Sequence, residues 1–163
     1  MKEQTYYEEQ RYRHEVKIRK LLDELPDFCR YYFIGTKHIS SARTRLSYAY
    51  DFKLFFFWLS VERLNGVGCV DIPIDVLEQL RSTDLEEYLD WLREYEFNGV
   101  RRTNTEGGIK RKLCSLRSLY TYLFNHDLIE TNPTKKIDVP RIPEKEIVLL
   151  ERNCKIFGRS RIW

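Results

Sequence analysis

The segment with the clearest chemical character in this chain is GIKRKLCSLRSLYTYLF, residues 108–124. It places Lys110, Arg111, Lys112 and Arg117 among apolar side chains, and no acidic residue interrupts it. Clustered cations attract phosphate groups through their electric field, whereas short hydroxyl side chains fix the register of a protein against backbone oxygens. The segment is therefore either an ordinary solvated helix surface or a surface for a polyanion.

A helical wheel at 100° per residue separates the segment into two faces. The face within about 60° of Ile109 is apolar and carries Leu113, Leu116, Tyr120, Leu123 and Phe124, with Leu119 at its margin. The opposite arc is polar and basic and carries Lys110, Arg111, Ser115, Arg117, Ser118 and Thr121. Lys112 lies near the apolar border. Because a helix fits the width of the DNA major groove, we predict that the basic arc contacts DNA.

Three further groups of residues make this interpretation stronger than a basic helix alone. Arg101 and Arg102 lie upstream in a polar loop, and Lys135 and Lys136 lie downstream. A second helix offers an uncharged polar face with Thr44, Ser47 and Tyr48, and with Arg43 and Arg45 beside it. The predicted DNA-binding residues are Arg43, Thr44, Ser47, Tyr48, Arg101, Arg102, Lys110, Arg111, Ser115, Arg117, Ser118, Lys135 and Lys136.

The distribution of charge also favours an anionic partner for the second half of the chain. The net charge of the 163 residues is +3. Residues 1–97 carry 14 Lys and Arg against 18 Asp and Glu, whereas residues 98–163 carry 14 against 7. No apolar run is long enough to cross a membrane, and the charged start does not resemble a secretory signal. We therefore expect a cytoplasmic protein with no membrane partner.

Residue patterns for enzyme chemistry are missing. The sequence contains no P-loop, no G-x-G-x-x-G, no H-E-x-x-H and no G-x-S-x-G. The four cysteines lie at least 40 residues apart and the three histidines are equally scattered, which is unlike a zinc site or a disulfide scaffold. We expect reduced thiols, no catalytic residues, no metal, no cofactor and no small-molecule substrate.

The elements that must position the basic segment are predicted to be helices. The 7 glycines and 5 prolines are few, and the prolines all fall between periodic segments, as in an all-α protein. The predicted elements are a helix over 8–25, a short helix near 28–35, a helix capped by Ser40 or Ser41 and ended by Gly66, a helix over 84–96 capped by Asp84, and a helix over 105–126. Residues 67–83 are expected to form a connector with one helical turn at most, and residues 98–108 a mobile loop. The apolar FFFWL, residues 55–59, should be enclosed by neighbours.

Two blocks of the sequence together resemble a known family. The first is T-x3-Y-x2-D-F-x2-F-x2-W-L, starting at Thr44, and the second is RKLCSLRSLYTYL, residues 111–123, followed by DLIETNP and Pro140. Between them, residues 83–92 read T-D-L-x-x-Y-L-x-x-L. In this order, over residues 24–145, they resemble the N-terminal core-binding domain of the tyrosine recombinases, the phage-integrase and Xer-type family.

The resemblance implies a compact, SAM-like bundle of four to five helices that clamps one face of a recombination half-site. Its second and last long helices would approach adjacent major grooves. We expect an N-terminal amphipathic helix over 1–24, a DNA-binding core-binding domain over 25–132, and a linker with an extended tail over 133–163.

The resemblance also implies that catalysis resides in a separate C-terminal domain, with an H-x-x-R motif and a tyrosine nucleophile. No histidine of this sequence is followed by arginine three residues later. We therefore expect no strand cleavage by this chain alone. It would be a fragment, a truncated product or a stand-alone regulator that occupies recombination sites, and self-association on DNA stays open.

A different class of function is a helical protein-interaction module. Its docking surface would be the stripe of Ile18, Leu21, Leu22 and Leu25, and its basic helix would serve only solubility.

Overall fold

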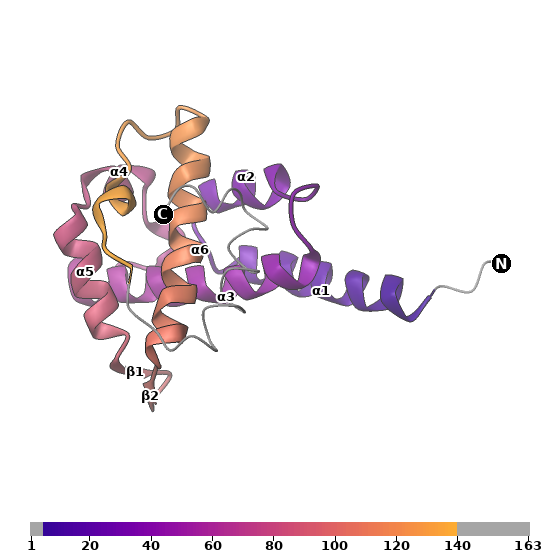
Figure 1. Ribbon diagram of the computed structural model, residues 1–163, viewed down its shortest axis with the longest axis horizontal. Helices are drawn as coiled ribbons and strands as arrows, with labels where there is room; N and C mark the ends of the chain where they lie inside the picture. Colours follow the sequence, from indigo (N-terminus) through magenta and orange to yellow (C-terminus); the bar gives the residue numbers. More distant parts are fainter. Residues whose placement is uncertain (1–4, 140–163) are drawn as a thin grey trace. The chain divides into compact units, whose positions relative to one another are not determined.

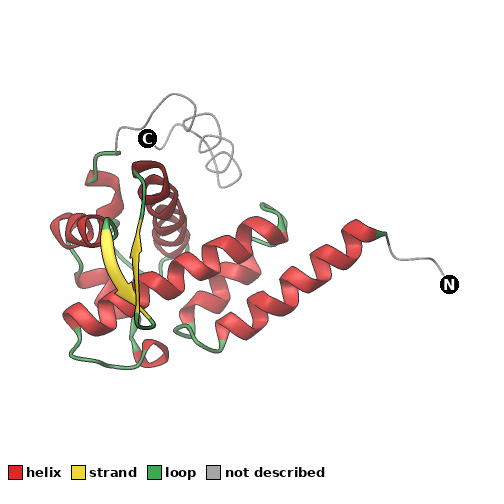
Figure 2. Cartoon of the chain, turned by 90° about the horizontal axis from the view of Figure 1, so that it is seen from below, coloured by secondary structure: helices red, strands yellow, loops and turns green. Residues whose placement is uncertain are grey.

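The computed structural model describes residues 5–139 and shows a predominantly α-helical chain, which confirms the predicted fold class (Figures 1 and 2). In this part of the chain the α-helices are α1 (Tyr6–Leu22), α2 (Phe28–Gly35), α3 (Ala42–Trp58), α4 (Ile74–Gln79), α5 (Ser82–Trp91) and α6 (Glu106–Asn125). The strands are β1 (Glu94–Phe97) and β2 (Val100–Thr103), and short helical turns lie at Leu59–Arg63, Cys69–Asp71 and Pro133–Lys136. The predicted tail lies outside the described residues from position 140 onward.

The chain divides after Ile72 into two compact units. The first unit contains α1, α2 and α3, and the second contains α4, α5, the two strands and α6. The division falls inside the segment 25–132 that the sequence suggested as one domain.

In the first unit, α1 begins at a capping box. The Thr5 hydroxyl accepts a hydrogen bond from the Glu8 amide at 3.3 Å, and the Thr5 amide donates to the Glu8 carboxylate at 3.0 Å. The helix therefore starts two residues before the predicted position, and it ends at Leu22 rather than residue 25. Its apolar stripe is buried and the helix packs against α3 (Figure 1). Because the residues of this stripe are buried within the first unit, the prediction that they form a docking surface for a partner protein is wrong.

Helix α3 is the central helix of the first unit, as its apolar run predicted. Ser41 caps it, since the Ser41 hydroxyl accepts a hydrogen bond from the Thr44 amide at 3.2 Å. Phe55 and Phe56 are almost fully buried. After a short π-helical turn, Asn65 and Gly66 adopt positive φ angles of 52° and 83°, and the segment ends where predicted.

The second unit is built around α6, whose N-cap Thr105 and C-cap His126 are the end residues of the predicted helix. The buried Tyr120 hydroxyl donates a hydrogen bond to the Leu77 carbonyl at 2.9 Å and so ties α6 to α4. This burial raises the pKa of Tyr120 well above its usual range. Asp84 does not cap α5: it accepts from the Arg81 amide at 2.8 Å, and the helix begins two residues earlier.

Residues 94–103 form a β-hairpin, so the prediction of a mobile loop here, with the preceding helix continuing to residue 96, is wrong (Figure 2). The turn is Asn98–Gly99, with φ angles of 52° and 73°, the pair that two-residue hairpin turns favour. Trp91 at the end of α5 stacks on Tyr95 of β1 with ring centroids 4.5 Å apart, which fixes the hairpin to the helix.

Two of the cysteines, Cys29 and Cys69, are free thiols as expected. Burial raises the pKa of the Cys29 thiol well above its usual range.

Candidate nucleic-acid interface

A strip along one side of α6 is basic, rich in hydroxyl groups and partly accessible. Thr105 caps the helix, its hydroxyl accepting a hydrogen bond from the Gly108 amide at 3.1 Å, and this sets the rotation of the residues that follow. The partly exposed residues of its basic and hydroxyl-rich side span about 120° of the wheel and are Lys110, Arg111, Ser118, Thr121 and Tyr122. Two cations and two hydroxyl groups of the predicted basic arc thus reach the surface.

Two other residues of that arc do not face outward. Ser115 is only 1% exposed, and its hydroxyl donates a hydrogen bond to the Lys112 carbonyl of the same helix at 2.7 Å. Arg117 is only 7% exposed. The expectation that these two side chains lie on an open face is wrong, because a wheel places residues around an axis but does not show which neighbours cover them.

Arg117 has a structural contact that explains its burial. Its guanidinium donates a hydrogen bond of 2.6 Å to the carbonyl of Ile137, which follows the turn Pro133–Lys136. Burial lowers the pKa of Arg117 to about 10, so the group stays protonated at neutral pH. Arg117 therefore holds this segment against α6, and Lys135 and Lys136 of the turn are exposed.

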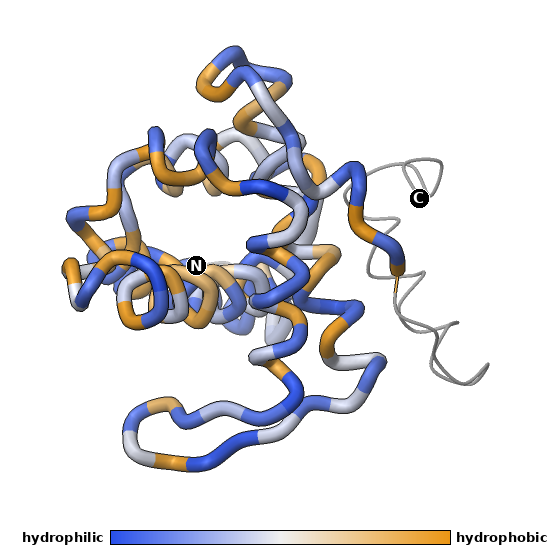
Figure 3. Tube along the Cα trace, turned by 90° about the vertical axis from the view of Figure 1, so that its left-hand side faces the viewer, coloured by the Kyte–Doolittle hydropathy of each residue, from blue (hydrophilic) through white to orange (hydrophobic). Residues whose placement is uncertain are grey.

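The hairpin gives Arg101 and Arg102 opposite orientations. Arg101 pairs across the ladder with Glu96, and its guanidinium forms an ion pair with Glu94. Arg102 lies opposite Tyr95 on the other face. Both arginines are exposed on a largely hydrophilic ribbon (Figure 3). Since Glu94 offsets the charge of Arg101, Arg102 is the stronger candidate for a phosphate contact.

The second unit is strongly polarised in charge along its sequence. Residues 73–97, which form α4, α5 and β1, carry two Lys and Arg against eight Asp and Glu. Residues 98–139, which form β2, α6 and the final turn, carry eight Lys and Arg against four Asp and Glu. The basic side chains are therefore concentrated on the elements that also carry the predicted contact residues.

In the first unit, three of the four predicted residues of α3 reach the surface. Arg43 is exposed, and Thr44 and Ser47 are partly exposed. Tyr48 is only 2% exposed and its ring lies beside Phe52, so the expectation that it faces outward is wrong. Arg45, which was placed beside this face, is buried and pairs with Glu15 of α1. This pairing lowers the pKa of the Glu15 carboxyl below its usual value.

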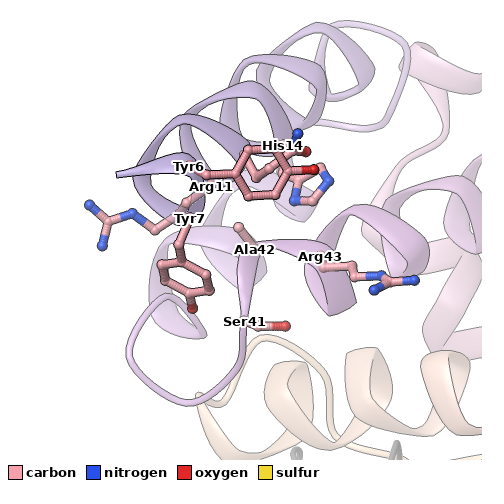
Figure 4. A pocket seen from close by; sticks show the side chains of 8 residues that line it. Tyr6, Tyr7, Arg11, His14, Ser41, Ala42 and Arg43 are labelled. Carbon is pink, nitrogen blue, oxygen red and sulfur yellow. The ribbon is translucent and has the colours of Figure 1, made fainter. Parts of the chain in front are cut away.

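A pocket that the sequence did not suggest lies between the start of α1 and the start of α3 (Figure 4). Its volume is about 520 Å³, and its lining residues are Tyr6, Tyr7, Gln10, Arg11 and His14 from α1 and Ser41, Ala42 and Arg43 from the start of α3. The capping box T-x-x-E at Thr5 could have placed both tyrosines inside the first helix. The pairing with α3 depends on tertiary packing.

Two other kinds of site are missing from residues 5–139. No group of three or more His, Cys, Asp or Glu side chains is placed to hold a metal ion. No helix in this range has the length and apolar character needed to cross a membrane.

The tyrosine recombinase XerC of Caldanaerobacter subterraneus is 30% identical to this chain over 135 residues, which is 77% of this chain and 36% of that protein. The chain is a homologue of the tyrosine recombinases. Two XerS tyrosine recombinases are also similar, with 32% identity over 111 residues in Lactococcus lactis and 30% over 112 residues in Streptococcus mutans. These matches cover 65% and 66% of this chain, and 31% and 32% of the relatives. The chain thus spans about a third of the length of the curated tyrosine recombinases that it matches.

The other two comparisons give no match. No family model and no solved structure matches the chain.

Proposed function

We propose that this chain is a DNA-binding domain that recognises a recombination or integration site as the N-terminal clamp domain of a tyrosine recombinase does. The observation that carries the proposal is the basic strip of α6 in a homologue of DNA recombinases. Lys110 and Arg111 are accessible there beside the Ser118 hydroxyl, and the acidic residues of the same unit are concentrated on other elements.

The proposed contacts in the second unit are mainly to phosphates. The cations that supply them are accessible: Arg102, Lys110, Arg111, Lys135 and Lys136. Base readout in the major groove would come from the strip on α6, and Arg43, Thr44 and Ser47 of α3 would supply further contacts. We assign Arg117 to positioning, because it holds the segment that carries Lys135 and Lys136. Ser115 and Tyr48 support their helices.

We expect no strand cleavage by the chain alone, because the H-x-x-R motif of the family does not occur in its sequence. Binding to a labelled duplex, measured over a range of salt concentrations, tests the proposal. The proposal predicts measurable binding at low salt that is lost well before molar salt. Affinity that does not change with salt would contradict it.

A further inference from the structure

The pocket between α1 and α3 is lined by aromatic rings and cations, and no acidic residue is part of its lining. Its lining contains two arginines, a histidine and two tyrosines, and no Asp or Glu. Figure 4 shows the rings of Tyr6 and Tyr7 between the guanidinium groups of Arg11 and Arg43, which extend toward opposite sides. A single strand of nucleic acid presents the complementary pattern, a flat base between two phosphates.

The two tyrosines are available for stacking. Tyr6 is 78% exposed and Tyr7 is 71% exposed, so neither ring is committed to the core. Base stacking on aromatic rings adds affinity in sites that bind unpaired strands, and it tolerates any base sequence. A base inside a duplex is already stacked on both faces, whereas an unpaired base has faces free for these rings.

The two arginines are available for phosphates. Within residues 5–139, neither Arg11 nor Arg43 forms an ion pair, whereas the next arginine along each helix does: Arg13 pairs with Glu9, and Arg45 with Glu15. Arg43 also lies in the first turn of α3, where backbone amides without intrahelical partners favour an anion. Arg13, which is exposed on the same helix and paired with Glu9, gives Arg11 a matched control.

We propose that this pocket binds one unpaired nucleotide of a DNA strand, with its base against Tyr6 and Tyr7 and its flanking phosphates at Arg11 and Arg43. The proposal rests on the proposed function, because it assumes that the chain binds a DNA duplex and adds that the first unit binds a single-stranded extension of this duplex. It predicts that a junction between duplex and single strand binds more tightly than the duplex alone.

The test compares the full chain on a blunt duplex and on the same duplex with a single-stranded overhang of either polarity. The overhang should tighten wild-type binding on the order of tenfold, the effect expected of one stacked base. The double substitution Tyr6→Ala, Tyr7→Ala should abolish this gain and leave the affinity for the blunt duplex unchanged. Tyr12→Ala, at a 64% exposed tyrosine of α1 outside the pocket, should keep the gain.

The arginines give a second, independent readout. Arg11→Ala should reduce the salt dependence of the gain, and Arg13→Ala should not. The proposal about the pocket is overturned if the overhang adds no affinity, or if the gain in affinity survives the double tyrosine substitution. In either case, binding to the blunt duplex still tests the proposed function. Blunt-duplex binding that is absent, with overhang binding present, would instead overturn the proposed function and support the pocket.

Discussion

Replacement of Lys110 and Arg111 by alanine should change how DNA binding depends on salt. Both side chains are partly exposed on the strip of α6, and alanine is the strongest helix former, so the helix should remain intact. If both cations contact phosphates, the double variant releases two fewer condensed counterions on binding. The slope of log K against log salt is therefore a more specific readout than affinity at one salt concentration.

The structure gives the magnitude. The five cations of the second unit that we propose as phosphate contacts predict a slope of about −4.5, and removal of two of them predicts about −2.7. Between about 50 and 200 mM salt, the wild-type affinity should then fall roughly 500-fold and the affinity of the double variant roughly 40-fold. This difference is large enough to measure with a non-specific duplex, so the target sequence need not be known.

Fluorescence anisotropy of a labelled duplex, titrated at several salt concentrations, provides the slopes. A matched control is Arg19→Ala, Lys20→Ala, which removes an adjacent pair of exposed cations from α1, outside the proposed surface. The control should keep the wild-type slope although its net charge changes equally. The reasoning is refuted if the α6 variant keeps the wild-type slope, or if the α1 control loses as much.

Two further predictions concern the contacts that position the surfaces. Glu15→Gln should lower the free energy of unfolding by about 1–3 kcal/mol at pH 7, because it leaves the buried Arg45 guanidinium without its carboxylate. Arg45 lowers the folded-state pKa of Glu15, so the stabilisation from this ion pair is complete above the ordinary pKa of 4.5 and is lost as the pH falls through the lower folded-state pKa. Urea denaturation at several pH values should show this loss of stability in acid for the wild type. The variant should not show it. Tyr120→Phe removes the hydrogen bond to the Leu77 carbonyl and should cost about 1–3 kcal/mol in the same assay, whereas an unchanged midpoint would show that the buried carbonyl finds another donor.

Local signals in the sequence were sufficient for the main helices. Ser41 and Thr105 are capping residues whose hydroxyl groups bond the first turn, and this chemistry depends only on residues three positions apart. The run of apolar side chains around Phe56 similarly identified the enclosed part of α3. The wheel of α6 correctly placed Lys110 and Arg111 outside the core.

Features that depend on distant segments could not be predicted in the same way. Arg117 is buried because the chain returns to α6 twenty residues later and offers the Ile137 carbonyl, which no local pattern encodes. The hairpin was missed although Asn98–Gly99 is a strong turn signal, because the acidic residues before it continue the pattern of the preceding helix. The pocket at Tyr7 and Arg43 exists only because α1 packs against α3.

The central claim is that the chain binds DNA at a recombination-type site. A gel-shift experiment with the full chain tests it most directly, using duplexes from the flanks of a mobile element adjacent to its gene and a scrambled duplex of the same length and composition. We predict that a flank duplex stays bound in an excess of scrambled competitor at moderate salt. If the flank duplex and the scrambled duplex displace the labelled flank duplex equally well, the chain does not recognise the flank sequence. If no shift is seen even at low salt, the chain does not bind DNA and the account as a whole is contradicted.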